Sequence, residues 1–334
     1  MRTSREVAHG YEIADADLQR RLDDRLAVVE QMLRESVKSH YPFVTETSRH
    51  LVDAGGKRFR PMLVLMAAEF GDAQAAQVLQ SAVVVELTHL ATLYHDDVMD
   101  EAMRRRGVDS ANARWDNTVA ILTGDFLFSR ASDILADLGP EAVRIQARTF
   151  ERLVVGQIKE TVGTPEGGDP VAHHISVLED KTGSLIATSG RFGAMFAGCD
   201  EAIVETLTLF GERIGVAFQL ADDLVDLTSE DGTSGKTQGT DLREGVLTLP
   251  ALLALAGDAP ADGRLRELLS RPLPDDGDHA EALALLLSHE AVAQARLEAR
   301  RWADAARDTL RALPGIPARD ALEQLCDYVV TRTA

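Results

Sequence analysis

Two long segments that are apolar around most of their circumference, 81–100 and 201–226, constrain the fold of this chain most strongly. Apolar residues on every side of a helical segment predict a helix that is buried all round. Alanine, leucine, glutamate and arginine dominate the rest of the sequence, and the period-two alternation typical of strands is scarce. The chain is therefore predicted to be all-α, with helix nearly throughout.

Clusters of glycine and proline divide the sequence into about a dozen segments of helical length, for example GTPEGGDP at 163–170 and RPLPDDGD at 271–278. No segment between them resembles a long flexible linker, and no short period repeats. A chain of 334 residues that is 45% hydrophobic can bury a large core. We therefore expect one domain over 1–334, a single large helical bundle around a central cavity, whose last helices occupy 279–334.

The bulk composition excludes several classes of protein. A formal charge of −19 and a pI near 4.9 argue against nucleic acid as a partner, because no basic stripe exists to neutralise phosphates. Two cysteines, Cys199 and Cys326, suit small core residues in a reducing compartment better than a disulfide framework. The N-terminus has no apolar secretory region, and no run approaches 18 apolar residues. These features predict a soluble cytoplasmic protein without a transmembrane segment.

Each of the two apolar segments ends in a triplet of aspartates with the same spacing. The triplets are Asp96, Asp97 and Asp100, and Asp222, Asp223 and Asp226. With 31 aspartates in the chain, one such triplet is explained by a solvated helix end, but a second copy makes coincidence a poor explanation. Carboxylates ~5 Å apart repel by roughly 3 kcal/mol at an effective dielectric near 20 unless a cation such as Mg²⁺ lies between them. If the two helices pack side by side, their six carboxylates are predicted to bind metal ions at the mouth of an apolar pocket.

The basic residues predict anion sites beside the aspartates. In GGKRFRP, Gly55 and Gly56 allow close approach of backbone N–H groups, and the helix that follows adds a positive dipole. Further candidates are His89, Arg105, Arg106, Lys181 and Lys236. Taken singly, each is an ordinary core histidine or surface cation. Together they predict one phosphate-bearing ligand bound through Mg²⁺ and another bound directly by Lys57 and Arg60, with an apolar pocket for both.

In these motifs the sequence resembles the trans-type polyprenyl diphosphate synthases, in particular the bacterial medium- and long-chain members. The likeness covers about 51–253 and rests on GGKRFRP, ELTHLATLYHDDVMDEAMRRRG, GDFLF, DKTGSLIATS, GVAFQLADDLVD and GKTQGTDLREG. It implies a prenyltransferase that joins isopentenyl diphosphate head to tail to an allylic diphosphate by Mg²⁺-dependent ionisation, condensation and elimination, giving a polyprenyl diphosphate. It also implies a homodimer that touches a membrane transiently when the product leaves.

The resemblance implies a role for each motif residue. Three Mg²⁺ ions per active site would bridge the allylic diphosphate to Asp96, Asp100 and Asp222, helped by Asp97, Asp223 and Asp226. Isopentenyl diphosphate would be held by Lys57, Arg60, His89 and Arg106, and the allylic diphosphate by Arg105, Lys181 and Lys236. Catalysis would involve Lys181, Thr182 and Gln219, because neutral oxygens of the last two can face the allylic carbocation without trapping it. The departing diphosphate would take the proton, so no general base is expected.

Two departures from the family pattern and two alternative functions accompany this assignment. The chain lacks the proline of RRGxPT, and Val246 stands where many members carry a lysine before TLP.

A class I terpene cyclase would need a second motif of the NDxxSxxxE kind, and the two asparagines of this chain are not in that context. The catalytic subunit of a two-component synthase stays open as an alternative, whereas a regulatory subunit would have degraded aspartate motifs.

Product length is predicted from the residues four, five, eight and twelve positions before Asp96. These are Thr92, Ala91, Thr88 and Val84, and none is aromatic. In the family, an aromatic residue at the fourth or fifth position closes the pocket at farnesyl length. Twelve helical residues span ~18 Å and an isoprene unit roughly 4 to 5 Å, so about four units fit below the motif. We expect a product longer than C20, in the range C30 to C50, shortened to about C15 by Ala91→Phe, unless Phe126 or Phe128 supplies the floor.

Overall fold

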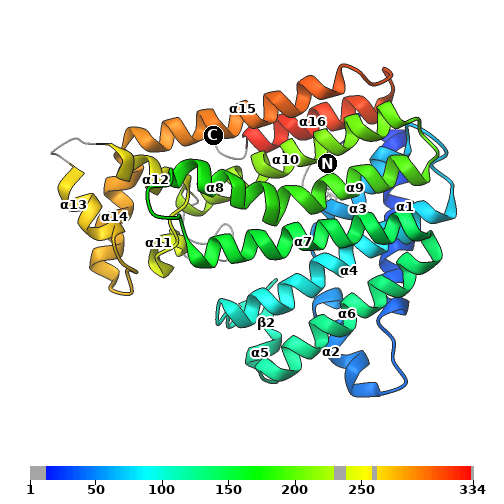
Figure 1. Ribbon diagram of the computed structural model, residues 1–334, viewed down its shortest axis with the longest axis horizontal. Coiled ribbons are helices and arrows are strands. Elements are labelled where there is room, and N and C mark those ends of the chain that lie inside the picture. The colour runs from blue at the N-terminus through cyan, green and yellow to red at the C-terminus, as the bar shows by residue number, and fades with distance from the viewer. Residues whose placement is uncertain (1–12, 229–237, 258–261, 332–334) are drawn as a thin grey trace, which may run out of the picture. The chain divides into compact units, whose positions relative to one another are not determined.

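The computed structural model describes residues 13–228, 238–257 and 262–331, and helices account for almost all of them (Figure 1). Within these ranges the strands are β1 (Arg104–Arg105) and β2 (Val108–Asp109), which form one small hairpin. The prediction of an all-α fold is confirmed. Among the same residues, no helix combines the length and the apolar character needed to cross a bilayer.

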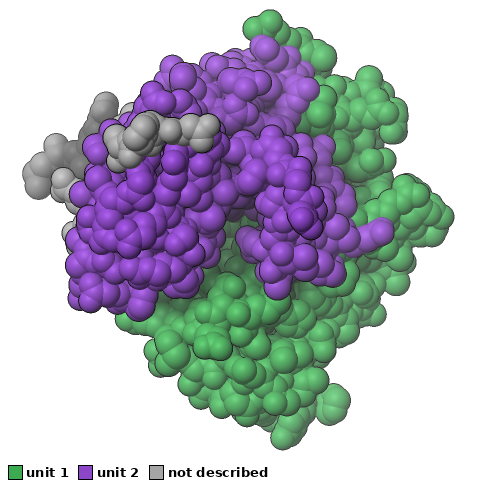
Figure 2. Space-filling view, turned by 60° about the vertical axis from the view of Figure 1, so that its left-hand side comes forward, with its two compact units in different colours: residues 1–150, 185–211, 310–322 green, residues 151–184, 212–309, 323–334 purple. Residues whose placement is uncertain are grey.

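Internal contacts divide the chain into two compact units, which Figure 2 colours separately. Unit 1 comprises 1–150, 185–211 and 310–322, and unit 2 comprises 151–184, 212–309 and 323–334. Both units receive residues from α7 (Pro140–Val162), α10 (Glu201–Thr228), α15 (Glu290–Leu310) and α16 (Pro317–Thr331). A single domain over 1–334 stays a prediction, and each unit is described by itself below.

Unit 1 is organised around α4 (Ala76–Met99), which packs against α1, α3 and α6. The remaining elements of this unit are α1 (Ala16–Ser36), α2 (Pro42–Asp53), α3 (Phe59–Ala68), α5 (Ala111–Arg114), α6 (Asn117–Leu138) and α9 (Ser184–Phe196). The expected helix over 81–100 is thus a single long helix. It contains three β-branched residues in a row, Val83 to Val85, all fully buried. Their low helix propensity costs a few tenths of a kcal/mol each, whereas burying each side chain stabilises the fold by about 1.5 kcal/mol or more.

Unit 2 has its own apolar core between α8, α10 and the helices that follow. Its remaining elements are α8 (Pro170–Leu178), the π-helix η1 (Glu179–Gly183), α11 (Thr240–Glu244), α12 (Leu249–Ala256), α13 (Gly263–Leu269) and α14 (Asp276–Ser288). Leu220, Leu224 and Leu227 of α10 are almost completely buried in this core. They recur every three to four residues, so α10 presents one apolar face to unit 2.

Aspartates outside the two triplets begin several helices. The side chains of Asp15, Asp116, Asp169 and Asp275 each accept a hydrogen bond from backbone N–H groups two or three residues further on. Such N-caps satisfy donors that have no partner within the helix, and the negative charge suits the positive end of the helix dipole. Helix capping therefore explains part of the abundance of aspartate in the sequence.

Candidate active site

A tight loop presents the cations of GGKRFRP at the start of α3. Gly55 and Gly56 have φ of 83° and 138°, and Arg58, which is not a glycine, has φ of 47°. A left-handed conformation costs a residue with a β-carbon about 1 to 2 kcal/mol, so contacts of the Arg58 side chain must hold it. The helix begins at Phe59, and Pro61 lies in its first turn, where a missing N–H leaves no hydrogen bond unmade.

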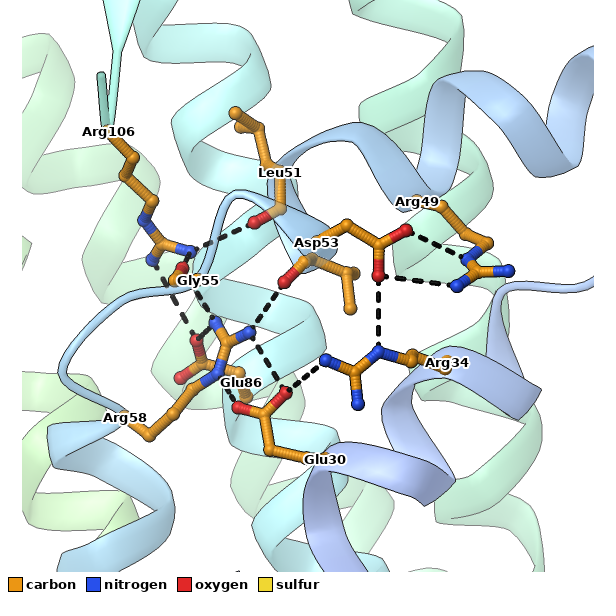
Figure 3. A network of polar contacts seen from close by, with 10 residues as sticks. Glu30, Arg34, Arg49, Leu51, Asp53, Gly55, Arg58, Glu86 and Arg106 are labelled. Carbon is orange, nitrogen blue, oxygen red and sulfur yellow. Dashed lines mark hydrogen bonds and ion pairs between the residues drawn. The ribbon is translucent and has the colours of Figure 1, made fainter. Parts of the chain in front are cut away.

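The Arg58 side chain is buried and satisfied by groups from three parts of unit 1 (Figure 3). Its Nη1 donates to Glu86 Oε1 of α4 at 2.7 Å, its Nη2 donates to the Val52 carbonyl at 2.8 Å, and its Nε donates to Glu30 of α1. Burial alone would lower the pKa of Arg58, but the two carboxylates outweigh it and the pKa is raised. Arg58 is therefore a fixed cation inside the protein, below the loop.

The run of three arginines forms the hairpin that the sequence did not predict. Strand β1 pairs with β2 in antiparallel register, with Arg105 opposite Val108. The two residues between them, Arg106 and Gly107, have φ of 53° and 80°. Positive φ at both positions is required by a two-residue type I′ turn, whose twist matches that of the strands. Asp109 stands where the pattern RRGxPT has its proline, and it lies in β2. The absence of this proline therefore alters only the hairpin.

This turn directs Arg106 back onto the loop before α3 (Figure 3). Its Nη1 donates to the carbonyl of Leu51 at 3.2 Å and to that of Gly55, and its Nη2 lies 3.8 Å from Glu86 Oε1. A β-carbon at Gly56 would lie 2.8 Å from Cζ of Arg106. The second glycine of the motif is therefore required by the close approach of this guanidinium.

His89 and Arg60 complete a cluster of positive charge on unit 1. Burial and then the charges of Arg60, Arg106, Arg58 and Arg105 hold the pKa of His89 well below its usual value, so its imidazole is neutral at pH 7. Burial likewise lowers the pKa of Arg60 to about 10, and its buried Nε has no hydrogen-bond partner. Among the described residues, the acids near this cluster pair with Arg58, Arg105 and Arg106, and the Nε donor of Arg60 is left for an anion from outside the protein. Lys57 is exposed beside it.

The first aspartate triplet lies at the C-terminal end of α4, where the helix dipole disfavours negative charge. Asp97 is fully buried, and its Oδ1 accepts from Nε and Nη2 of Arg105, both at 2.6 Å. Its Oδ2 is buried without a partner, and burial raises the pKa of this carboxyl group. Asp96 is half-buried, and Asp100, the C-cap, is exposed. The three carboxylates therefore do not share one open face.

The second triplet, on the part of α10 in unit 2, has the same arrangement. The middle residue, Asp223, is buried and accepts from Gln219 Nε2 at 3.0 Å, while Asp222 and Asp226 are half-buried. Gln219 Oε1 in turn accepts from the Thr182 hydroxyl at 3.3 Å. Adjacent residues of a helix point about 100° apart, which turns the middle aspartate inward in both motifs.

Lys181 and Thr182 lie on the π-helix η1 of unit 2. Asp180, which precedes Lys181 in η1, accepts from Nε of Arg152 and from Nζ of Lys159, each at 2.8 Å. Burial raises the pKa of Asp180, but these two cations outweigh it and the pKa is lowered. Lys181 itself bonds to Glu160. Single turns of π-helix occur frequently at functional sites, and here ion pairs hold the turn in place.

The donor atoms of the triplets fit a hard divalent cation. Carboxylate oxygens are the preferred ligands of Mg²⁺, and the buried Oδ2 of Asp97, without a partner, marks where positive charge is missing. In the described part of the chain, however, no three carboxylate, imidazole or thiol groups converge on one point. One triplet alone therefore does not build a closed cage, which agrees with Mg²⁺ keeping several non-protein ligands.

The structure thus brings some of the expected residues together within a unit. Unit 1 gathers Arg60, His89, Arg105, Arg106 and Asp97, and unit 2 links Thr182, Gln219 and Asp223. Lys236 lies outside the described residues. Val246 stands where many relatives carry lysine, and its side chain is 43% exposed. Its hydrogen bond in the described structure comes from the backbone, whose N–H donates to the Asp241 carbonyl.

Sequence reasoning missed the buried acids that support these cations. Glu86 and Glu30 bind Arg58, and Asp180 binds Arg152, yet none of these acids was singled out. A signal was present for Glu86, because it is the single acid within the apolar run SAVVVELTHL. Acidic residues are almost never fully buried unless they are paired.

The residues expected to control product length share one face of α4 and differ in burial. Ala91, Thr88 and Val84 are fully buried, and Thr92 is half-buried. Thr88 Oγ1 donates to the Val84 carbonyl at 2.9 Å and accepts from Gln146 Nε2 at 2.8 Å. A β-carbon at Gly124 of α6 would lie 3.1 Å from the Ala91 carbonyl, so α6 closes tightly over this stripe.

The aromatic residues of GDFLF lie beside the first triplet. The Phe128 ring is 5.8 Å from the ring of His95, the residue before Asp96, and 4.5 Å from that of Phe150 on α7, measured between centroids. Phe126 is half-buried. Phe128 therefore lies near the motif, beside the residue that precedes Asp96.

Comparison with known proteins decides the family. A family model described as polyprenyl synthetase matches residues 41–286, most of the chain. The chain belongs to the polyprenyl synthetase family. It is therefore a prenyltransferase, and its all-α fold is that of the family's solved structures.

Three similar members of the polyprenyl synthetase family cover nearly the whole chain. Nonaprenyl diphosphate synthase of Mycobacterium tuberculosis is 47% identical over 99% of both chains. Dimethylallyltranstransferase of the same organism is 37% identical over 96% of this chain and 97% of its own. The crystal structure of geranylgeranyl pyrophosphate synthase from Corynebacterium glutamicum, complexed with calcium and isoprenyl diphosphate, is 45% identical with a TM-score of 0.87, over 97% of this chain and all of its own.

Proposed function

We propose that this member of the polyprenyl synthetase family condenses isopentenyl diphosphate with an allylic diphosphate and makes a polyprenyl diphosphate longer than C20. The observation that carries the proposal is the cationic cluster of unit 1, where Arg60 has a buried Nε without a partner and a pKa lowered to about 10. A buried cationic donor without a hydrogen-bond partner is costly, and a diphosphate oxygen would relieve that cost.

Isopentenyl diphosphate binds this cluster without metal. Arg60 and Arg106 donate to the diphosphate oxygens, exposed Lys57 closes the site from the solvent side, and His89 donates one N–H while staying neutral. A neutral histidine adds a hydrogen bond without adding to the repulsion among the surrounding arginines. The arginines give directional bonds, which fix the orientation of the diphosphate and hence of the double bond.

The allylic diphosphate is the partner of the aspartate triplets. Asp96, Asp100 and Asp222 would hold Mg²⁺, three ions in the complete site, with Asp97, Asp223 and Asp226 in support. When bound, Mg²⁺ stabilises the negative charge that develops on the leaving diphosphate. The calcium in the geranylgeranyl pyrophosphate synthase complex supports a divalent ion in this family. Arg105, Lys181 and Lys236 contribute cationic contacts to the same diphosphate.

Neutral oxygens then face the allylic cation. Gln219 donates from Nε2 to Asp223, so its amide oxygen is fixed on the opposite side, next to Thr182. Oriented dipoles of this kind stabilise a carbocation without forming a covalent bond to it. The double bond of isopentenyl diphosphate attacks the cation, and the released diphosphate accepts the proton that is lost from the new chain.

A product longer than C20 is supported by two observations. The side chains at the fourth and fifth positions before Asp96 are small, Thr92 and Ala91. The relative with 47% identity carries the name nonaprenyl diphosphate synthase, although the solved relative with 45% identity carries the name geranylgeranyl pyrophosphate synthase. We further propose that the enzyme acts in the cytoplasm as a homodimer and contacts a membrane transiently for product release.

Incubation of the purified chain with isopentenyl diphosphate, farnesyl diphosphate and Mg²⁺ tests the proposal. Chromatography of the dephosphorylated products should show linear chains beyond C20. A cyclic hydrocarbon would instead support a terpene cyclase. Absence of condensation by the chain alone would contradict the proposal of a self-sufficient enzyme and would favour a two-component synthase.

A further inference from the structure

Two carboxylates lie beneath the cationic cluster and have no role in the chemistry described above (Figure 3). Glu86 of α4 is almost completely buried, with a side chain 2% exposed, and Glu30 of α1 is 23% exposed. A buried carboxylate is costly unless it is paired and hydrogen-bonded. Each of these two carboxylates must therefore act through the groups that it contacts.

The two acids contact different parts of the cluster. Both accept from Arg58, whose Nη1 lies 2.7 Å from Glu86 Oε1 and whose Nε and Nη2 bond to Glu30. Glu86 Oε1 also lies 3.8 Å from Nη2 of Arg106, and its charge reaches Arg60, where it opposes the effect of burial. Glu86 thus contacts Arg58 and Arg106 directly, whereas Glu30 contacts Arg58 and Arg34 and affects Arg106 only through its charge.

Arg58 and Arg106 both bind the backbone of the loop before α3. Arg58 donates to the carbonyls of Val52 and Gly55, and Arg106 donates to those of Leu51 and Gly55. Both arginines have positive φ, at 47° and 53°, so each needs its side-chain contacts to stay in that conformation. Besides the Gly55 carbonyl, which accepts from both, the Glu86 carboxylate joins these two side chains, and among the described residues it is the acid placed within 4 Å of each.

We propose that Glu86 is a positioning residue, which orders Arg58, Arg106 and the loop at 55–60 before isopentenyl diphosphate binds. Its carboxylate acts through the arginines and does not touch the substrate. The inference rests on the proposed function, because it assigns isopentenyl diphosphate to this cluster. Order established before binding lowers the conformational entropy that binding must remove.

The negative charge of Glu86 has a competing effect, which changes the affinity for isopentenyl diphosphate in the opposite direction. Removing the negative charge of Glu86 makes the cluster more positive, which by itself strengthens the binding of an anion. If charge alone mattered, Glu86→Gln would therefore bind isopentenyl diphosphate more tightly. If positioning matters more, the same variant binds more weakly, because a glutamine offers the two arginines one neutral acceptor oxygen in place of two that share a negative charge.

The experiment is calorimetric titration of the full chain with isopentenyl diphosphate in EDTA, which isolates the metal-free site. Three variants are compared with the wild type: Glu86→Gln, Glu30→Gln and the matched control Glu69→Gln. Glu69 is also an ion-paired acid of low exposure, 2.6 Å from Arg21, but it follows the far end of α3, ~15 Å along that helix from Arg58. Thermal denaturation of each variant records its stability.

We expect Glu86→Gln to weaken binding about tenfold or more, Glu30→Gln to weaken it less, and Glu69→Gln to leave it unchanged. In turnover assays, Glu86→Gln should raise KM for isopentenyl diphosphate about as much, with KM for the allylic substrate and kcat nearly constant. Equal or tighter binding by Glu86→Gln would overturn the inference, as would equal weakening in all three variants, which would indicate a loss of stability only.

The same experiment separates this inference from the proposed function. A wild-type chain that binds isopentenyl diphosphate in EDTA but condenses nothing would refute the function and leave the positioning role to be judged from the variants. A wild-type chain that condenses normally while Glu86→Gln binds like the wild type would refute only the positioning role. No binding by the wild type in EDTA would remove the metal-free site and the inference together.

Discussion

Aspartate has two roles in this chain, which differ in the end of the helix that it occupies. Asp15, Asp116, Asp169 and Asp275 cap helix N-termini, where backbone N–H groups and the dipole favour a carboxylate. The first triplet lies at the C-terminus of α4, where the dipole opposes negative charge. An acid at a position that the helix dipole disfavours agrees with the proposal that this triplet holds Mg²⁺.

The first and second triplets should both be essential for turnover. Asp96→Ala and Asp222→Ala each remove a proposed metal ligand, so turnover should fall at least ~10²-fold, the loss typical of a transition-state contact worth about 3 kcal/mol. Steady-state kinetics at saturating Mg²⁺ measure this. Asp133→Ala is the control, because Asp133 is an exposed acid whose ion pair in the described part of unit 1 is with Arg130, and its variant should match the wild type. Activity of Asp96→Ala near the wild-type level would refute the assignment.

His89 should make the protein less stable at acidic pH. Its pKa is lowered in the folded state, so below about pH 6.5 the unfolded chain binds more protons, and stability is lost as pH falls. Between pH 6.5 and 5.5 this amounts to roughly 1 kcal/mol. Urea denaturation of the wild type and of His89→Gln should show this difference in their free energies of unfolding. Identical pH dependence in the two proteins would show that His89 titrates normally.

Close contacts between helices position the functional side chains of each unit. In unit 2, α7 approaches the π-helix η1 at Gly156, where an added β-carbon would lie 2.7 Å from the backbone nitrogen of Lys181 and 3.0 Å from Cβ of Asp180. In unit 1, α6 approaches α4 at Gly124, where an added β-carbon would meet the ring of His95 first and would lie 3.1 Å from the Ala91 carbonyl. Backbone atoms cannot move aside as a side chain can, so the requirement for glycine is stricter at Gly156.

Gly156→Ala should displace η1 and destabilise the protein by about 1 to 3 kcal/mol, the usual cost of overpacking. Because Lys181 moves with η1, KM for the allylic diphosphate should rise as well. Gly263→Ala is the control, since nothing lies within 4 Å of a β-carbon there. Thermal denaturation and steady-state kinetics measure both effects, and a Gly156→Ala protein as stable as the control would contradict this packing.

Its lower burial makes Thr92 a better position than Ala91 for shortening the product. Thr92 is half-buried, whereas Ala91 is fully buried under α6. We expect Thr92→Phe to shorten the principal product to about C15 with the first condensation intact, since it touches neither phosphate nor metal. Ala91→Phe should also destabilise the fold by about 1 to 3 kcal/mol. Chromatography of dephosphorylated products tests this, and an unchanged distribution in Thr92→Phe would show that this face does not line the channel.

The proposed homodimer is a property of the whole molecule. Several large apolar side chains of α6 and α7 are exposed in the single chain, including Ile121, Leu122 and Phe150. Exposed apolar area of this kind often marks a subunit interface. Sedimentation velocity at micromolar concentration should give twice the mass of the 36.2 kDa chain. A mass equal to one chain would rule out the homodimer, and the wild-type mass in Asp96→Ala would show that this variant fails for chemical reasons.

Local patterns in the sequence were sufficient to predict the fold class and the set of polar residues. Apolar character around 81–100 and 201–226 requires buried helices whatever their partners, and the recurrence of one aspartate spacing indicates a shared chemistry. Both features depend on residues close together in the chain. The same is true of GGKRFRP, whose glycines and cations indicate an anion site before any contact is known.

Only the tertiary structure decided how these residues are used. Arg58 and Arg60 are two positions apart, yet one is neutralised by Glu30 and Glu86 while Nε of the other is buried without a partner. The acids that make this difference are 28 positions from Arg58 in either direction. Burial and ion pairing depend on which helices pack together, and that packing is set by the sum of many apolar contacts rather than by the local pattern. For the same reason the sequence did not show that the middle aspartate of each triplet turns inward, to Arg105 in one and to Gln219 in the other.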